Sequence, residues 1–247
     1  MEERLTQDLT IAAGDCDSTG RLGMLETFLL FMNAACSHAD MLGCGLNDMR
    51  EKGLLWVAVR NMVRFIRRPA MGEKVSLTTW PVVPGRASSE RDYMIKDTEG
   101  NIISLGRTEW TVVDRHKGRI ISPAKIFSED IEFSSEKADL PPFTRFRIDP
   151  SLFRSLGSYS VRSTDCDVGG HMNNVAYVRM MCSALSTREW RELSPDIMEA
   201  YYVSQMHEDE RMELYIAEED GRAVFRADSQ EGKTVFWMSA SKEDSIK

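Results

Sequence analysis

Two stretches of the chain carry apolar residues at the three-to-four-residue spacing of an amphipathic helix. The first ends at Gly43-Cys44-Gly45, and its apolar positions are Leu25, Phe28, Met32, Ala35, Ala39 and Leu42. The second reaches about Arg191, with apolar positions Met172, Val175, Val178, Cys182 and Leu185. Glycines directly after the last apolar position are a usual helix stop. The pattern therefore predicts two long helices, one in each half of the chain.

Runs of β-branched and aromatic residues, some alternating with polar positions, predict antiparallel strands around these helices. In the first half the predicted strands span residues 5–14, 54–66, 75–83, 88–97 and 102–114. The second half repeats this plan, with strands near residues 159–163, 200–208, 211–219, 222–229 and 233–241. A long helix followed by four or more antiparallel strands predicts an α+β fold, in which each sheet can wrap around its helix.

An internal repeat relates the two halves. Residues 15–22 (DCDSTGRL) match residues 165–172 (DCDVGGHM) at a constant offset of 150, with four of eight positions identical. Two copies of one supersecondary unit are the economical interpretation. Between them, residues 127–150 lose the periodic pattern and become rich in charge, serine and proline, as linkers are. We predict a first domain at 1–128, a linker at 129–150 and a second domain at 151–247.

The stretch 165–174 (DCDVGGHMNN) holds the one cluster that suggests chemistry. A Gly-Gly pair permits a sharp turn, after which His171, Asn173 and Asn174 fall at a helix N-terminus. Unpaired backbone N–H groups and the positive end of the helix dipole would stabilise a developing oxyanion there. The first copy has Arg21 in place of His171, so only the second offers a histidine acid or base. The alternative is structural: a turn histidine and two capping asparagines.

Charge and cysteine content narrow the classes of function. A net charge of −8 disfavours binding to nucleic acid or to anionic membranes. Five cysteines without a C-x-x-C pair argue against a disulfide framework and against a thiolate zinc site. No apolar run approaches the length of a membrane span, and the N-terminus lacks the pattern of a secretory signal. We expect a soluble cytoplasmic protein that uses no metal and no organic cofactor.

Short motifs along nearly the whole chain resemble those of the acyl-acyl-carrier-protein thioesterases of plants and bacteria. In the first half they are Glu26-Thr27, 52–57 (KGLLWV), 71–75 (MGEKV), Thr79-Trp80, Gly85-Arg86, 91–93 (RDY) and 107–110 (RTEW). In the second half they are residues 165–174 followed by Tyr177. Singly each motif is weak, whereas together and in this order they are specific. The resemblance implies two tandem hotdog domains, each a curved antiparallel sheet wrapped around one long helix.

The resemblance also implies catalytic positions. Asp167 and His171 fall on the family's aspartate and histidine, whereas Gly169 stands where the family has a catalytic asparagine. The family's remaining acid would lie on the strand after the second helix. An ungapped match gives His207 at that place, and a one-residue shift gives Glu208. We prefer Glu208, because a carboxylate can act as general base toward water without a partner to fix its tautomer.

The implied reaction is hydrolysis of the thioester between a fatty acyl chain and the phosphopantetheine of acyl carrier protein, releasing a free fatty acid in fatty acid biosynthesis. Asn173 and Asn174 would shape the substrate site. The arginines Arg64, Arg67 and Arg68 form a basic run in an acidic chain, which suits an acidic carrier protein as partner. Because sheet edges of hotdog domains commonly pair, a homodimer is a possible assembly.

Three other functions fit the same sequence. One is the same hydrolysis on acyl-CoA, and another is acyl binding without turnover, which Gly169 favours. A dehydratase also pairs a histidine with an acid and is a weaker alternative. For a hydrolase we expect direct attack of water, because Cys166 has a counterpart, Cys16, in the copy without histidine. Apart from His171, nothing near Cys166 in the sequence marks it as an activated thiolate.

Overall fold

The computed structural model of the chain describes residues 4–128, 130–219 and 221–243. The chain divides into two compact units, Met1–Pro141 and Pro142–Lys247, and each is described here by itself. The break between the units falls inside the predicted linker, whose first residue, 129, lies outside the described residues. The domain bounds of 1–128 and 151–247 stay a prediction.

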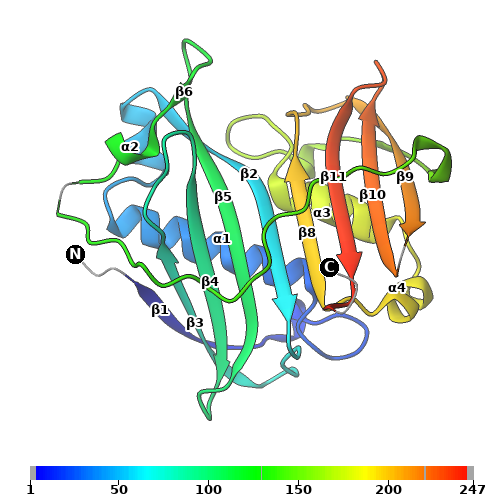
Figure 1. Cartoon of the computed structure of the whole chain (residues 1–247), viewed down its shortest axis with the longest axis horizontal. Helices are drawn as coiled ribbons and strands as arrows, with labels where there is room; N and C mark the ends of the chain where they lie inside the picture. The colour runs from blue at the N-terminus through cyan, green and yellow to red at the C-terminus, as the bar shows by residue number, and fades with distance from the viewer. Residues whose placement is uncertain (1–3, 129, 220, 244–247) are drawn as a thin grey trace. The chain divides into compact units, whose positions relative to one another are not determined.

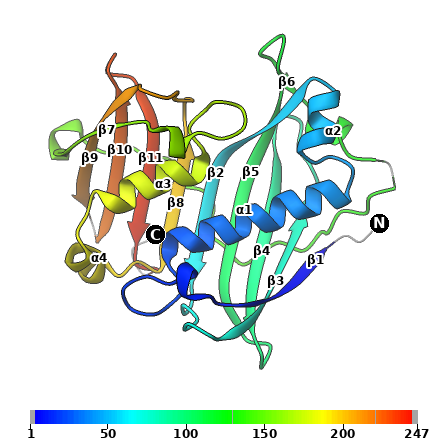
Figure 2. The same ribbon diagram turned by 180° about the vertical axis from the view of Figure 1, so that it is seen from behind.

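The first unit is an antiparallel sheet with one long helix against it. Its strands are β1 (Leu5–Thr10), β2 (Leu54–Phe65), β3 (Lys74–Pro81), β4 (Ser89–Asp97), β5 (Ile102–Asp114) and the short β6 (Ile120–Ile121). They pair in the order β1-β3-β4-β5-β2, with β6 added to β5. Helix α1 (Met24–Met41) crosses one face of this sheet, and α2 (Leu46–Glu51) follows it (Figures 1 and 2).

The second unit repeats this topology. Its strands are β7 (Arg154–Ser160), β8 (Ile197–Tyr202), β9 (Arg211–Glu219), β10 (Arg222–Ser229) and β11 (Thr234–Ser241). They pair in the order β7-β9-β10-β11-β8. This is the order of the first unit, with β7 in the place of β1, β8 in that of β2, and so on along the chain. Helices α3 (Asn174–Ser183) and α4 (Thr187–Leu193) lie on one side of this sheet (Figure 2). Both the α+β class and the duplicated plan are confirmed.

The second predicted helix is wrong in its length. Instead of continuing to Arg191, α3 ends at Ser183, and a new helix begins after Ser186. The Ser186 hydroxyl accepts from the backbone N–H of Glu189 at 3.3 Å, while the Glu189 carboxylate accepts from the backbone N–H of Ser186 at 2.7 Å. This reciprocal capping box starts a helix at a point where the apolar spacing alone predicts continuity.

Three predicted strands also differ from the structure. The strand predicted at 5–14 stops at Thr10, and the one predicted at 159–163 stops at Ser160. In both cases a repeat aspartate follows: the Asp15 carboxylate accepts from the N–H of Ala12, and that of Asp165 from Arg162. These side-chain bonds replace ladder bonds and end the strands. The strand predicted at 200–208 ends earlier, at Tyr202.

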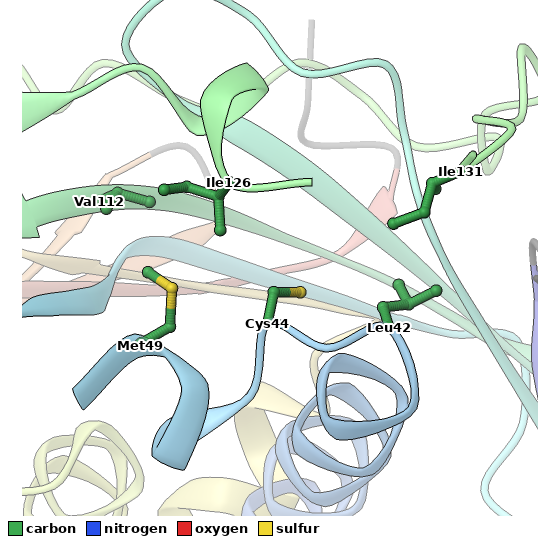
Figure 3. Packing of buried hydrophobic residues seen from close by; sticks show 6 residues of the cluster. All are labelled: Leu42, Cys44, Met49, Val112, Ile126 and Ile131. Atoms are coloured by element: carbon green, nitrogen blue, oxygen red, sulfur yellow. The ribbon is translucent and has the colours of Figure 1, made fainter. Parts of the chain in front are cut away.

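A hydrophobic cluster lies around the C-terminal end of α1. It joins residues from the end of α1, from α2, from β5 and from the segment after β6: Leu42, Cys44, Met49, Val112, Ile126 and Ile131 (Figure 3). Each of them is at most 9% exposed. Ile126 and Ile131 follow β6, and Ile131 lies in the stretch without periodic pattern, so packing in the first unit extends beyond its last strand.

Residues 134–139 run across the face of the first sheet that is opposite α1 (Figures 1 and 2), and we call them the strap. The indole N–H of Trp80 donates to the carbonyl of Glu136 at 2.9 Å. Asp92 accepts from the backbone N–H of Ala138 at 2.7 Å and forms a buried, bidentate pair with Arg107 at 2.6 and 2.9 Å. Arg107 also donates to the Ala138 carbonyl. The strap is thus held by hydrogen bonds to its backbone groups. Its sequence therefore shows no periodic pattern of apolar side chains from which this packing could be predicted.

Across the described ranges, no helix combines the length and the apolar character needed to cross a bilayer. The same ranges contain no group of three or more histidine, cysteine or acidic side chains that could hold a metal ion.

Candidate active site

The two repeat copies fold into the same loop. In the first, the N–H of Asp17 donates to the carbonyl of Arg21 at 2.9 Å; in the second, the N–H of Asp167 donates to the carbonyl of His171 at 2.8 Å. A glycine with positive φ precedes Arg21 and His171 alike, at +70° and +77°. The sequence repeat is therefore a repeat of backbone geometry, with different side chains mounted on it.

The Asp167 carboxylate organises the loop in the second unit. Its Oδ1 accepts from the backbone N–H of Gly169 at 2.7 Å and from that of His171 at 3.4 Å. The contact from Asp167 to His171 therefore involves the peptide group rather than the imidazole. A Cβ added to Gly169 would lie 3.0 Å from the Asp167 carboxylate and 3.2 Å from Nδ1 of His171. The place of the family asparagine thus lies directly between these two groups.

The imidazole of His171 packs against that of His207. Their ring centroids are 4.9 Å apart, and the planes are inclined by 55°. His207 belongs to the segment 203–210, which we call the turn. The turn is held to the loop by a hydrogen bond from the N–H of Met172 to the carbonyl of Met206 at 2.7 Å, and by the Tyr177 hydroxyl, which donates to the Ser204 carbonyl at 3.1 Å.

His207 and Glu208 lie in this turn rather than on the strand where they were predicted. The Glu210 carboxylate accepts from the backbone N–H of His207 at 2.8 Å and lies 3.6 Å from its ring Nδ1. Asp209 adopts a left-handed conformation with φ of +66°. Glu210 therefore orients His207, a role that the sequence pattern did not reveal because it depends on this turn.

Asn173 is the N-cap of α3. Its side-chain oxygen accepts from the N–H of Val175 at 2.8 Å, and its carbonyl accepts from the N–H groups of Ala176 and Tyr177. Asn174 is the first residue of the helix. The predicted use of free helix N–H groups as oxyanion donors is therefore wrong for residues 175–177, because Asn173 already occupies them.

Cys166 lies beside carboxylates. Burial raises the pKa of its thiol, and the negative charges of Glu208, Asp165 and Asp167 raise it further. Its Sγ donates to the carbonyl of Arg162 at 3.6 Å, as Sγ of Cys16 does to that of Ala12 at 3.4 Å in the first copy. A thiol with a raised pKa is a poor nucleophile near neutral pH. This also places Glu208 close to Cys166.

Asp165 forms a buried support beneath the loop. Its Oδ2 accepts from the Tyr159 hydroxyl and from the N–H of Arg162, both at 2.8 Å. Burial raises the pKa of Tyr159 to about 12, and the hydrogen bond to Asp165 and the negative charge of that carboxylate contribute to the rise. The repeat pointed to Asp165, whereas nothing in the sequence pattern indicated Tyr159.

The turn also has a counterpart in the first unit. Glu73 accepts from the N–H of Ala70 there, as Glu210 accepts from His207, and Leu22 donates to Pro69 as Met172 donates to Met206. Ala70 therefore corresponds to His207, and both histidines are specific to the second unit. By the same correspondence, Gln205 takes the place of Arg68.

Arg68 shows where a side chain at that place reaches. Its guanidinium pairs with Asp17 and donates to the carbonyl of Leu22 at 3.2 Å and to the hydroxyl of Thr19 at 3.4 Å. Thr19 corresponds to Gly169 in the repeat. By this correspondence the backbone position of Gln205 is the one from which Arg68 reaches Thr19, a relation that comes from structure rather than from any sequence pattern.

The three arginines predicted to bind a carrier protein each contact acceptors within the first unit. Arg64 donates to the carbonyl of Asp139 at 3.2 Å, and Arg68 pairs with Asp17. Arg67 pairs with Glu73 at 2.7 Å and with Asp97 at 3.0 Å, and its hydrogen bond holds the pKa of Glu73 below its usual value. Arg67 is the most exposed of the three side chains, at 40%.

The class of protein is defined by two hotdog-like units, of which the second pairs His171, in the loop before α3, with His207, in the turn after β8. The family model described as the acyl-ACP thioesterase N-terminal domain matches residues 2–129, and that of the acyl-ACP thioesterase C-terminal domain matches residues 154–245. The chain belongs to the acyl-ACP thioesterase family.

Named relatives agree with this assignment. An acyl-[acyl-carrier-protein] hydrolase of Cuphea viscosissima is 25% identical over 68% of this chain and 43% of its own length. Oleoyl-acyl carrier protein thioesterase 1, chloroplastic, of Arabidopsis thaliana is 25% identical over 60% and 46%. The chain thus spans less than half the length of these relatives.

The solved structures confirm the double hotdog fold. An acyl-ACP thioesterase from Bacteroides thetaiotaomicron superposes with a TM-score of 0.86 at 18% identity, covering 97% of both chains. A 12:0-ACP thioesterase from Umbellularia californica gives 0.80 at 16% identity, covering 98% of this chain and 97% of its own.

Proposed function

We propose that this chain hydrolyses the thioester of acyl-acyl carrier protein and releases a free fatty acid. The observation that carries the proposal is the pairing of His171 with His207, at two places where the first unit has Arg21 and Ala70. The relatives named above are hydrolases or thioesterases of acyl carrier protein substrates. Histidines are the side chains best suited to move protons near neutral pH.

In the proposed mechanism His207 is the general base. The Glu210 carboxylate lies 3.6 Å from Nδ1 of its ring, so that Nε2 is the nitrogen proposed to accept a proton from water. Water oxygen bonds to the thioester carbonyl carbon, the C–S bond then breaks, and the proton passes to the leaving thiolate. Glu208 is the second candidate for the base, since a carboxylate needs no tautomer control.

His171 and Gln205 are the proposed groups around the carbonyl. His171 donates to the developing oxyanion, while Asp167 fixes the loop that carries it. Gln205 supplies the amide that Gly169 lacks, because its counterpart Arg68 reaches the position equivalent to Gly169. Asn173 and Asn174 shape the helix start beside the site.

The decisive experiment measures free-thiol release from a panel of acyl-carrier-protein thioesters, with the same acyl chains on CoA as a second panel. Faster turnover on the carrier protein supports the proposal, and faster turnover on CoA would favour the acyl-CoA alternative. Tight acyl binding without thiol release would favour a non-catalytic acyl-binding protein, a function to which Gly169 lends support. A cytoplasmic location, the homodimer and carrier docking at Arg64, Arg67 and Arg68 stay proposals.

A further inference from the structure

A row of polar side chains lies inside the first unit, on the sheet face covered by α1. Arg91 on β4 is directly opposite Thr108 on β5, which is directly opposite Asn61 on β2. Directly opposed residues share one face of a sheet. The guanidinium of Arg91 donates to Nδ1 of His38 on α1 at 2.9 Å, so this face is the one toward the helix. All four residues are buried.

Arg91 is charged and has no counter-ion there. Its acceptors are neutral: His38 and the hydroxyl of Thr79, at 3.2 Å. Within the part of the chain that the structure describes, no carboxylate forms an ion pair with it, and burial lowers its pKa. By contrast, the buried Arg107 on β5 is held by both oxygens of Asp92. Buried charges in proteins are almost always paired or bound to an ion.

Three more polar atoms on this face are buried without a hydrogen bond of ordinary geometry to a described residue: Oδ1 of Asn61, the hydroxyl of Tyr93 and Nε1 of Trp110. Burial raises the pKa of Tyr93 to about 12, and weaker interactions of its hydroxyl with the side chains of Thr108 and Trp110 oppose that rise. Tyr93 and Trp110 each lie two residues along a strand from a member of the row, so they share its face. Buried polar atoms are rarely left unsatisfied, and several on one face point to an absent bound group.

We propose that this row binds the carboxylate of an aliphatic acid. Arg91 supplies the counter-ion, Tyr93 and Trp110 supply neutral donors, and Asn61 accepts from the acid when it is protonated. The buried Phe31 ring, stacked on Tyr93 with centroids 4.6 Å apart, makes the surroundings of this row apolar. The carboxylate has two sources: the fatty acid released by the proposed hydrolysis, or a carboxyl group at the far end of an acyl chain.

Binding is measured by calorimetric titration of decanoate, with decanol as the uncharged analogue, into the full chain carrying His171→Ala. Decanoate should bind about tenfold to a hundredfold more tightly than decanol, the range for hydrogen bonds to a charged group. Adding Arg91→Met should abolish this preference. Arg60→Met, which removes a half-buried arginine paired with Glu109, should leave it intact. A preference that survives Arg91→Met, or no binding of decanoate, would overturn the proposal.

Thermal unfolding separates a ligand site from a structural arginine. Without ligand, Arg91→Met should melt at or above the temperature of the parent, because it removes an unpaired buried charge. Decanoate should raise the melting temperature of the parent only. If water alone satisfies these polar atoms, decanoate will stabilise neither protein, and the proposal fails.

The two sources are distinguished by kinetics with the wild-type chain and Arg91→Met. A far-end carboxylate predicts faster turnover of thioesters of dicarboxylic acids than of plain acyl thioesters, with the preference lost in the variant. The product as ligand predicts no such preference, but inhibition by decanoate that Arg91→Met relieves. The proposed hydrolase function is needed only to decide between these two sources of the carboxylate, and not for the binding of decanoate itself. Decanoate binding through Arg91 in a chain that releases no thiol would reject the hydrolase and retain the site.

Discussion

His171 is the residue on which the proposed chemistry depends most. We expect His171→Ala to lower kcat on an acyl thioester by about 100-fold or more while the chain stays folded, because loss of one oxyanion donor costs about that much. The matched control is Arg21→Ala, which changes the same position of the first repeat copy. Steady-state thiol release and a circular dichroism spectrum check both. Equal losses in the two variants would mean that the loop acts through structure rather than chemistry.

Glu210 acts through His207 in the proposed mechanism. Glu210→Gln should therefore lower kcat about tenfold with little change in KM, because the base is less well oriented. Glu210→Asp should recover part of the loss. Glu208→Gln is the matched comparison, since it removes the adjacent carboxylate of the same turn. A deeper loss of kcat in Glu208→Gln would transfer the general base from His207 to Glu208.

Cys166 should behave as an unreactive thiol. Burial and its neighbouring carboxylates raise its pKa above the ordinary value of 9.0, so the thiolate is scarce at pH 8 and increases with pH. Alkylation by iodoacetamide, followed by peptide mass spectrometry, should be slower than for a free cysteine at pH 8 and still accelerate above pH 9. Cys166→Ala should keep most of the activity. A transient acyl-cysteine formed at the turnover rate would replace water attack with covalent catalysis.

The sequence predicts part of this site. Asp167 and His171 stand out because the repeat and the family motif both point to the loop. Glu210 and Gln205 do not, since their relation to the loop depends on how the turn after Tyr202 folds back. The start of α3 misleads in another way. Its sequence suggests free N–H donors, but the side-chain and carbonyl oxygens of Asn173 accept hydrogen bonds from them. Hydrogen bonds of this kind are decided by backbone conformation, which residue spacing does not report.

Among the elements, periodic patterns locate most helices and strands, and fail where side chains bond to backbone. The capping box at Ser186 divides the second helix, and Asp15 and Asp165 end two strands early. The strap is the largest omission, because residues 134–139 look like a linker and are fixed by backbone groups instead.

The buried ion pair of Asp92 with Arg107, which also holds the strap, allows the contribution of the strap to stability to be tested. Asp92→Ala should lower the free energy of unfolding by about 3–5 kcal/mol, because it leaves Arg107 buried and unpaired. Glu136→Ala, on the same strap but in a solvent-exposed pair with Arg4, should cost less than about 1 kcal/mol. Urea denaturation monitored by tryptophan fluorescence measures both. Similar values for the two variants would show that the strap contributes little to the first unit's stability.

For the molecule as a whole, the question is how an acidic chain of net charge −8 would attract the proposed partner, an acidic carrier protein. Changing Arg64, Arg67 and Arg68 together to glutamine should raise KM for the carrier-bound substrate and flatten its dependence on salt. Turnover of a small uncharged thioester should hardly change. Because each arginine also binds acceptors in its own unit, the unfolding free energy must be measured alongside. Equal losses on both substrates would assign these residues to folding.

The loop shared by the two units has an implication for how such a chain evolves. Its backbone hydrogen bonds are the same in the copy with histidines and in the copy without them. The backbone therefore maintains the fold of the loop, and the side chains mounted on it determine its reactivity. One copy in a duplicated ancestor could therefore lose its chemistry when its two histidines were replaced by the residues that are now Arg21 and Ala70, without any change in the backbone. The copy without histidines can then change its side chains for another role. Conversely, the double substitution Arg21→His with Ala70→His is a starting point for a second reactive centre in one polypeptide.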